Sequence, residues 1–352
     1  MHSTFRAHSF LAMLVVGLFP LAANAGLFLF VESQQNPLLI THPTGYTGGN
    51  NQHLEISVCI HPNSESKSDL EIPVQNSITV WNQLEPTLGN VIRPNPEMDV
   101  SEFDVESVIL HEIGHCIGLA HPNLATESGL SEFKDRSFAK ALPEFPTESD
   151  PVDRYNLDAG ADGVIGTRDD LRGGDENLNW FQSGINDPFS MPSVIDASTY
   201  TVDIANLPQS GDHEYVEIAG IDVWEERGLP NTAAVMFQGI FNRETRRELN
   251  HDDAAMIRLG MSGTDRTQGT AKDYTYELQY GGIDDSCDIT ISMQGSSFGF
   301  CSVSATSAGL PANHWRVVSA NIEVGSTSEI NWHFNDQLLE EGLIFQDRFE
   351  QE

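Results

Sequence analysis

Positively charged residues are scarce in this chain of 352 residues. It holds 18 lysines and arginines against 52 aspartates and glutamates, which gives a formal net charge of -34 at pH 7. A surface of that sign repels the phosphate backbone, so the composition excludes nucleic acid as a partner. We interpret most of the acidic residues as solvated surface charge.

Long apolar runs are lacking too, apart from a short one near the N-terminus. Residues 10–19 are apolar, Arg6 precedes them, and the small residues Ala23-Asn24-Ala25 follow. The run is too short to cross a bilayer, and the arrangement is typical of a secretory signal peptide over residues 1–25. The alternative is a buried N-terminal helix. We therefore expect no membrane span and a mature chain that begins near Gly26, secreted or periplasmic.

Cysteines number only four, so an exported chain can form at most two disulfides, in one of three pairings. Cys287 and Cys301 flank a strand–turn–strand pattern, and we expect them to pair. Cys59 then remains to pair with Cys116, tying an early strand to a later helix. In the alternative interpretation Cys116 is a small buried apolar residue.

The strongest pattern that is present is the run HEIGHCIGLAH at residues 111–121. His111 and His115 are four residues apart, so on a helix they point the same way, one turn apart. Gly118 tolerates left-handed backbone angles, and the sharp turn can bring His121 back as a third ligand. Three imidazole nitrogens hold zinc and leave its fourth position open, as in catalytic sites. The alternative is a helix with two solvated histidines.

Glu112 lies next to the first candidate ligand, where its carboxylate can reach a water on the zinc ion. The residues before it predict a buried helix, with Ser101 as N-cap and Asp104 completing a capping box. Apolar residues then follow at helical spacing, at Val105, Val108 and Ile109.

The extended pattern HExxHxxGxxH resembles the metzincin zinc peptidases. A second stretch, residues 233–237, looks like the Met-turn of that family, in which a methionine, here Met236, lies beneath the zinc histidines. Residues 249–260 are similar to the segment that ends the catalytic domain of matrixins and serralysins, with Asn250 as helix N-cap and Asp253 completing a capping box. The alternative for Met236 is an ordinary core methionine.

The chain departs from the family in several places. Pro122 follows the third histidine as in serralysins, but tandem GGxGxD repeats are absent and Gln238 stands where serralysins carry a tyrosine ligand. The inhibitory cysteine motif of matrixins is also absent, so a latency role for Cys59 is not expected. The resemblance is closest to matrixins, and it covers residues 53–122 and 233–260.

The expected elements also leave part of the family's sheet unaccounted for. Residues 26–51 are rich in glycine, proline, threonine and asparagine and are expected to be irregular, whereas 53–60 predict a strand and 70–84 a helix. Between the helix at 70–84 and the zinc helix only one short strand is expected, at 91–93, where matrixins have a longer run of strands. The upper sheet, whose edge strand usually binds peptide substrate in the family, is therefore abbreviated or supplied from elsewhere.

An acidic segment over residues 123–230 separates the third histidine from the Met-turn and is interpreted as an insertion. Within it, an EF-hand-like loop begins at Asp158. Asp162 takes its fifth position, the Val164 carbonyl its seventh and Asp169 its twelfth. Glycine at the third position and aspartate at the twelfth depart from the usual ligands. We predict a calcium loop here, and the alternative is a solvated Asp-Gly turn.

Beyond residue 266 the composition favours strands, and we expect an all-β appendage over residues 266–352. The predicted strands are 274–280, 287–293, 298–303, 315–324 and 330–334. The fold expected for the whole is α+β: a metzincin-like catalytic domain over residues 26–265 with a zinc-binding helix, a small sheet and the long insertion, followed by the β-rich region.

The resemblance implies a secreted zinc endopeptidase that hydrolyses protein or peptide substrates with Glu112 as general base. Two other function classes stay open at this point. One is a non-catalytic secreted protein that binds zinc, calcium and a partner; the intact Glu112 argues against it, since a structural zinc site needs no general base. The other is a zinc amidase acting on cell-wall peptide, because function depends on the site rather than the fold.

Overall fold

The computed structural model describes residues 25–31, 36, 38–87, 89–121, 179–181, 195–196, 200–202, 231–237 and 239–339. The predicted signal peptide, apart from its last residue, lies outside the described residues, as does most of the predicted insertion. The candidate calcium ligands Asp158, Asp162, Val164 and Asp169 lie outside them too. Among the described helices, none is long and apolar enough to cross a membrane.

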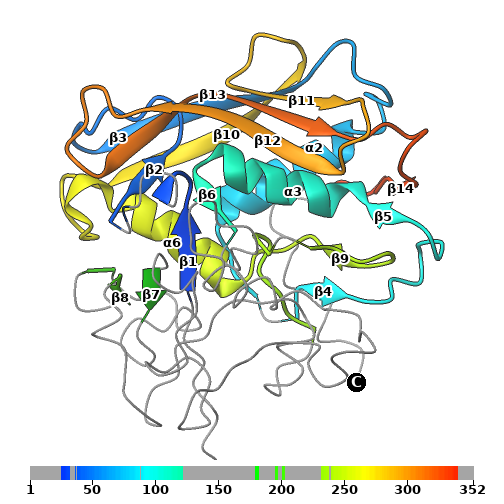
Figure 1. The fold of residues 1–352 in the computed structure, drawn as a ribbon, viewed down its shortest axis with the longest axis horizontal. Coiled ribbons are helices and arrows are strands. Elements are labelled where there is room, and N and C mark those ends of the chain that lie inside the picture. The colour runs from blue at the N-terminus through cyan, green and yellow to red at the C-terminus, as the bar shows by residue number, and fades with distance from the viewer. Residues whose placement is uncertain are drawn as a thin grey trace, which may run out of the picture.

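A six-stranded sheet, mainly parallel, dominates the molecule (Figure 1). The strand order is β10-β3-β11-β13-β12, and β2 pairs with β13 beside this path. Only β12 runs antiparallel to its neighbour. The strands are β2 (Ile40–His42), β3 (Gln52–Ile60), β10 (Tyr274–Ile283), β11 (Ile289–Met293), β12 (Gly299–Thr306) and β13 (His314–Val324).

The strands predicted after residue 266 are present, but they do not form a separate β appendage. β10 pairs with β3 along nearly its whole length, from Tyr274 opposite Gln52 to Ile283 opposite Ile60, and β11 takes the other edge of β3. The strands expected to be few before the HExxH helix are thus joined in one sheet by strands from the last third of the chain. Alternation of apolar residues predicts a strand but does not identify its partner, which here lies more than 200 residues away.

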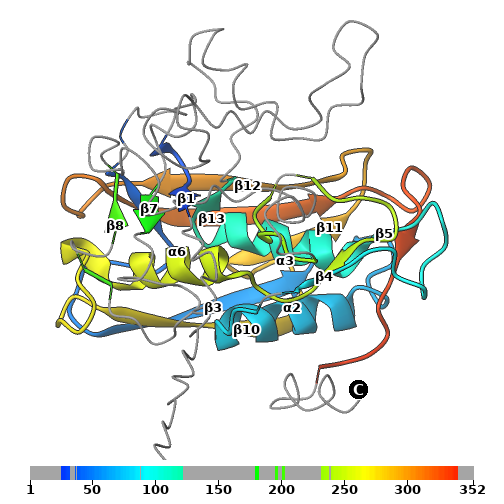
Figure 2. The same ribbon diagram turned by 90° about the horizontal axis from the view of Figure 1, so that it is seen from below.

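Helices cover one face of the sheet (Figure 2). They are α2 (Glu71–Gln83), α3 (Val105–Cys116) and α6 (His251–Met261). The first half of β10 alternates buried and exposed residues, so one of its faces lies in the core and the other in solvent. The apolar positions of α2 repeat at helical spacing, and Trp81 among them is fully buried. The Trp81 indole N–H donates to the Leu110 carbonyl at 2.9 Å, which joins α2 to α3.

The N-cap of α3 is Asp104, so the expectation that Ser101 caps this helix is wrong. The Asp104 carboxylate accepts from the backbone N–H and the hydroxyl of Ser107, at 3.0 and 2.6 Å. It is fully buried and forms a two-point ion pair with Arg247. For α6 the predicted cap is confirmed: Asn250 and Asp253 form a capping box.

Shorter strands complete the fold and contradict the expectation that residues 26–51 are wholly irregular. A second sheet has the order β6-β1-β7-β8, and two-stranded pairs join β4 to β9 and β5 to β14. These strands are β1 (Ala25–Phe28), β4 (Val91–Ile92), β5 (Phe103–Asp104), β6 (Leu119–Ala120), β7 (Asn179–Phe181), β8 (Tyr200–Thr201), β9 (Thr245–Arg246) and β14 (Trp332–His333).

The disulfides join Cys59 to Cys287 and Cys116 to Cys301, so both predicted pairings are wrong. Cys59 lies on β3 opposite Thr290 of β11, and Cys287 lies two residues before the start of β11, which places the two cysteines side by side. β12 packs on α3 and carries Cys301 to Cys116. The sequence pattern predicted strands near Cys287 and Cys301 but not which elements lie beside them, so it could not select the observed pairing among the three possible ones. Two disulfides are consistent with an oxidising, extracellular compartment.

Candidate metal centre

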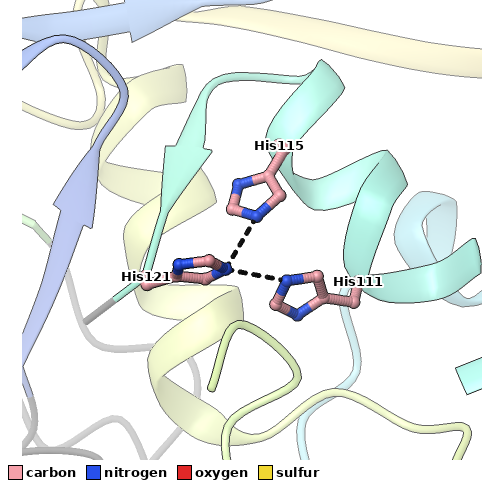
Figure 3. A group of neighbouring side chains, drawn as sticks. All are labelled: His111, His115 and His121. Atoms are coloured by element: carbon pink, nitrogen blue, oxygen red, sulfur yellow. Dashed lines mark hydrogen bonds between the residues drawn. The ribbon is translucent and has the colours of Figure 1, made fainter. Parts of the chain in front are cut away.

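The end of α3 and the turn after it bring three histidines together (Figure 3). His111 and His115 lie on α3, and His121 follows the short strand β6. Between them the backbone turns at Gly118, whose φ is +117°. A Cβ there would lie 2.2 Å from the carbonyl oxygen of Thr41, so only glycine lets the turn approach β2 this closely.

The ring nitrogens of these residues converge on one point. His121 Nε2 lies 3.0 Å from His111 Nε2 and 3.0 Å from His115 Nε2. Two nitrogens bound to one tetrahedral zinc ion, each at about 2.0–2.1 Å, are separated by about 3.3 Å. The three rings therefore need to move apart by only a few tenths of an ångström to hold such an ion.

Hydrogen bonds to carbonyl groups fix the tautomers of two of these rings. His111 Nδ1–H donates to the Val235 carbonyl at 2.6 Å, and His115 Nδ1–H donates to the Leu119 carbonyl at 2.8 Å. Since a carbonyl oxygen cannot donate, both protons are on Nδ1 and both Nε2 lone pairs point toward His121. A single proton on His121 Nε2 cannot bond well to both lone pairs, whereas a metal ion can accept the lone pairs of all three Nε2 atoms. Carbonyl groups that accept from Nδ1–H also commonly orient metal-binding histidines.

Burial keeps these histidines neutral. Desolvation, followed by the neighbouring histidines, lowers the pKa of His111 and His121 well below the usual value, and desolvation lowers the pKa of His115 to about 4. Metal ligation requires the unprotonated ring, so the site is in the ligand form at neutral pH.

Glu112 lies beside the histidines on α3 and is buried, with 4% of its surface exposed. The backbone N–H of Cys301 is close enough to its carboxylate to favour the ionised form, and its Oε2 is buried with no hydrogen-bond partner. Desolvation raises the pKa of Glu112 to about 8, and a divalent cation held by the histidines would lower it. A buried carboxylate with an unpartnered oxygen can accept a proton next to a metal ion.

Met236 packs against α3 between the two helical histidines. A Cβ on Gly114 would lie 2.3 Å from Met236 Sδ and 2.9 Å from the Trp81 ring, so the missing side chain makes room for the thioether. The segment of Met236 is held from α6, because the Asp253 carboxylate accepts from the backbone N–H groups of Val235, at 2.8 Å, and of Met236, at 3.1 Å.

Sequence reasoning did not identify three contributors to this site: Gly114, Val235 and Asp253. Asp253 was expected only to cap its own helix, and it does so through the Asn250 backbone N–H at 3.0 Å. The same carboxylate also fixes the backbone whose carbonyl, at Val235, orients His111. The two adjacent aspartates at the start of α6 were a signal for such a role, but they do not reveal which backbone groups they reach.

Comparisons of the chain with protein-family models, curated proteins and solved structures give no match. The resemblance to metzincins therefore rests on the sequence motifs alone, and the structure brings together three histidines able to hold a metal ion.

Proposed function

We propose that the chain is a secreted zinc endopeptidase of metzincin type with matrixin-like features. The observation that carries this proposal is the convergence of three unprotonated histidine nitrogens next to a buried carboxylate with an unpartnered oxygen. A purely structural zinc site takes four protein ligands and needs no general base, whereas here three histidines lie next to the carboxylate of Glu112.

The residues divide the chemistry between them. His111, His115 and His121 hold zinc, which when bound polarises the scissile carbonyl and makes water a nucleophile near neutral pH. Glu112 takes a proton from the attacking water through Oε2 and passes it to the leaving amine. Met236 supports the helix between the ligands.

The substrate side of the proposal rests on β12. This strand lies at the end of the sheet order, and its outer edge pairs with no described strand. An extended peptide can add to such an edge through backbone hydrogen bonds, which is the role the resemblance assigns to the upper edge strand. β12 packs on α3, so a peptide bound there lies close to Glu112.

Three parts of the proposal rest on sequence alone. These are the signal peptide over residues 1–25, the insertion over residues 123–230, and the calcium loop formed by Asp158, Asp162, Val164 and Asp169.

The test compares wild type with Glu112→Gln on casein and on cell-wall peptide, with and without a zinc chelator. We expect wild type to cleave casein, the chelator to stop it, and Glu112→Gln to lower kcat/KM by at least about 100-fold. Zinc content should remain at one ion per chain in the variant, because Glu112 is not a ligand.

Glu106→Gln is the matched control, since it makes the same change to a buried glutamate of the same helix that does not contact the histidines. Its turnover should equal that of wild type. Full turnover of casein by zinc-loaded Glu112→Gln would refute the proposal, and turnover of cell-wall peptide alone would identify the amidase instead.

A further inference from the structure

We propose that strand β12 orients Glu112, with Gly299 and Cys301 as positioning residues and the Cys116–Cys301 disulfide as the lock. The inference rests on the proposed function and deepens it, because it assigns to the edge strand a role in placing the general base as well as in binding substrate.

The first observation is direct contact between the strand backbone and the carboxylate. The Cys301 backbone N–H is close enough to the Glu112 carboxylate to favour its ionised form. A Cβ added to Gly299 would lie 3.0 Å from Glu112 Oε1 and 2.7 Å from Val108 Cγ1. Glycine at 299 thus lets the backbone come close enough for residues 299–301 to cover the carboxylate.

The second observation is that the helix and the strand match in spacing. Val108, Glu112 and Cys116 are four residues apart on one face of α3, with a rise of about 6 Å per step. Gly299 and Cys301 are two residues apart on one face of β12, a rise of about 6.6 Å. A Cβ on Gly299 would meet both Val108 and Glu112, and Cys301 is bonded to Cys116 with its backbone N–H near Glu112, so the strand and the helix run in step there. The two elements, β12 and α3, pack side by side (Figure 1).

The third observation explains why a covalent lock is useful there. β12 is held on one side only, by β13, and no described strand pairs with its other edge. Cys301 and Cys116 are separated by 185 residues, so the chain itself does not hold the strand against the helix. The disulfide lies one helical turn beyond Glu112 and fixes the strand at the point where the carboxylate is held.

The other disulfide provides a matched control. Cys59 and Cys287 enclose 228 residues, so its removal has nearly the same effect on the entropy of the unfolded chain. It joins β3 to the start of β11, away from α3. A variant without it should lose stability to a similar extent without moving Glu112.

The experiment measures kcat, KM, zinc content and melting temperature for wild type, Cys116→Ala/Cys301→Ala and Cys59→Ala/Cys287→Ala, assayed below all three melting temperatures. We expect kcat of the first variant to fall about 10- to 100-fold with one zinc ion retained, because a displacement of about 1 Å costs that much. The second variant should keep kcat within about twofold of wild type. Gly299→Ala, with both disulfides intact, should also lower kcat at full zinc content.

Equal kcat in the two double variants overturns the inference, as does wild-type kcat in Gly299→Ala, which needs no disulfide to be removed. If the first double variant does not fold, Gly299→Ala decides alone. An inactive, zinc-loaded wild type removes the proposed function and this inference with it, whereas an active wild type with insensitive variants removes only the inference.

Discussion

Gly118 sets the position of the third histidine at the scale of a single residue. Its backbone has a φ of +117°, and the space a Cβ would need is occupied by the Thr41 carbonyl oxygen, 2.2 Å away. Because this carbonyl belongs to the backbone of β2, it cannot rotate out of the way as a flexible side chain could. The turn from His115 to His121 therefore depends on glycine twice, for its conformation and for its packing.

We predict that Gly118→Ala destabilises the fold and weakens zinc binding. Gly309→Ala is the control, since Gly309 also has a positive φ, +79°, but has nothing within 4 Å of the added carbon. The left-handed backbone alone costs alanine about 1–2 kcal/mol, and the clash should add about 1–3 kcal/mol at Gly118 only. Urea unfolding and a zinc titration measure both effects. Equal losses in the two variants would show that the contact with Thr41 is unimportant.

The best-predicted part of the site is the group of three histidines. The spacing of His111, His115 and His121 was enough to predict that they meet, because helix geometry and one glycine turn act over only 11 residues. The Val235 carbonyl that orients His111 could not be predicted, since it arrives from 124 residues away along the chain.

The start of α3 shows how elements are held together by buried polar groups. The side-chain amides of Asn76, on α2, and Asn335, near the C-terminus, both donate to Glu106 Oε2, at 3.0 and 2.7 Å. Arg247 lies 3.8 Å from the other oxygen. Desolvation outweighs these partners and raises the pKa of Glu106 from 4.5 to about 7.

This shift predicts a pH dependence of stability. Between pH 4.5 and about 7 the folded chain holds a proton on Glu106 that the unfolded chain has released, so the free energy of unfolding falls as pH rises through that window. The shift corresponds to about 3 kcal/mol at pH 7 and above. Glu106→Gln keeps an acceptor for both amides but cannot ionise, so it removes this loss.

The measurement is chemical unfolding of wild type and Glu106→Gln from pH 4.5 to 8, reported as the difference between them. That difference should grow in favour of the variant up to about pH 7 and then level off. Glu329→Gln, at an exposed position, controls for the general effect of removing an acid from so acidic a chain. A constant difference across the range would mean that Glu106 ionises normally in the folded protein.

At the scale of elements, sequence patterns predicted α2 and α6 within one residue or two but misplaced the cap of α3. Ser101 and Asp104 fit a capping box on local grounds. The pairing of Asp104 with Arg247, 143 residues away, favours Asp104 as the cap instead. The local sequence pattern does not show which residue, far along the chain, will pair with a helix cap.

The whole molecule depends on a sheet assembled from the two ends of the described chain. β3 comes before the metal centre in sequence, whereas its partners β10 and β11 come after it. The core beneath the helices includes residues of the later strands, such as the buried Ile289 and Ile291 of β11 and Ile322 of β13. Local patterning predicted each strand but suggested an appendage, because contiguity in sequence was taken for contiguity in space.

This arrangement predicts that the metal centre cannot fold without the C-terminal strands. A chain ending at residue 265 keeps all three histidines and Glu112 but leaves both edges of β3 unpaired, removes the cover of α2 and α3, and loses both disulfide partners, Cys287 and Cys301. We expect no cooperative melt and no stoichiometric zinc binding from that fragment.

A chain ending at residue 339 keeps every described element and is the control, expected to melt and bind zinc as the full chain does. Circular dichroism melts and zinc analysis of the two fragments decide the matter. A fragment ending at 265 that melts cooperatively with one bound zinc would mean that residues 266–339 are an independent appendage, despite sharing a sheet with β3.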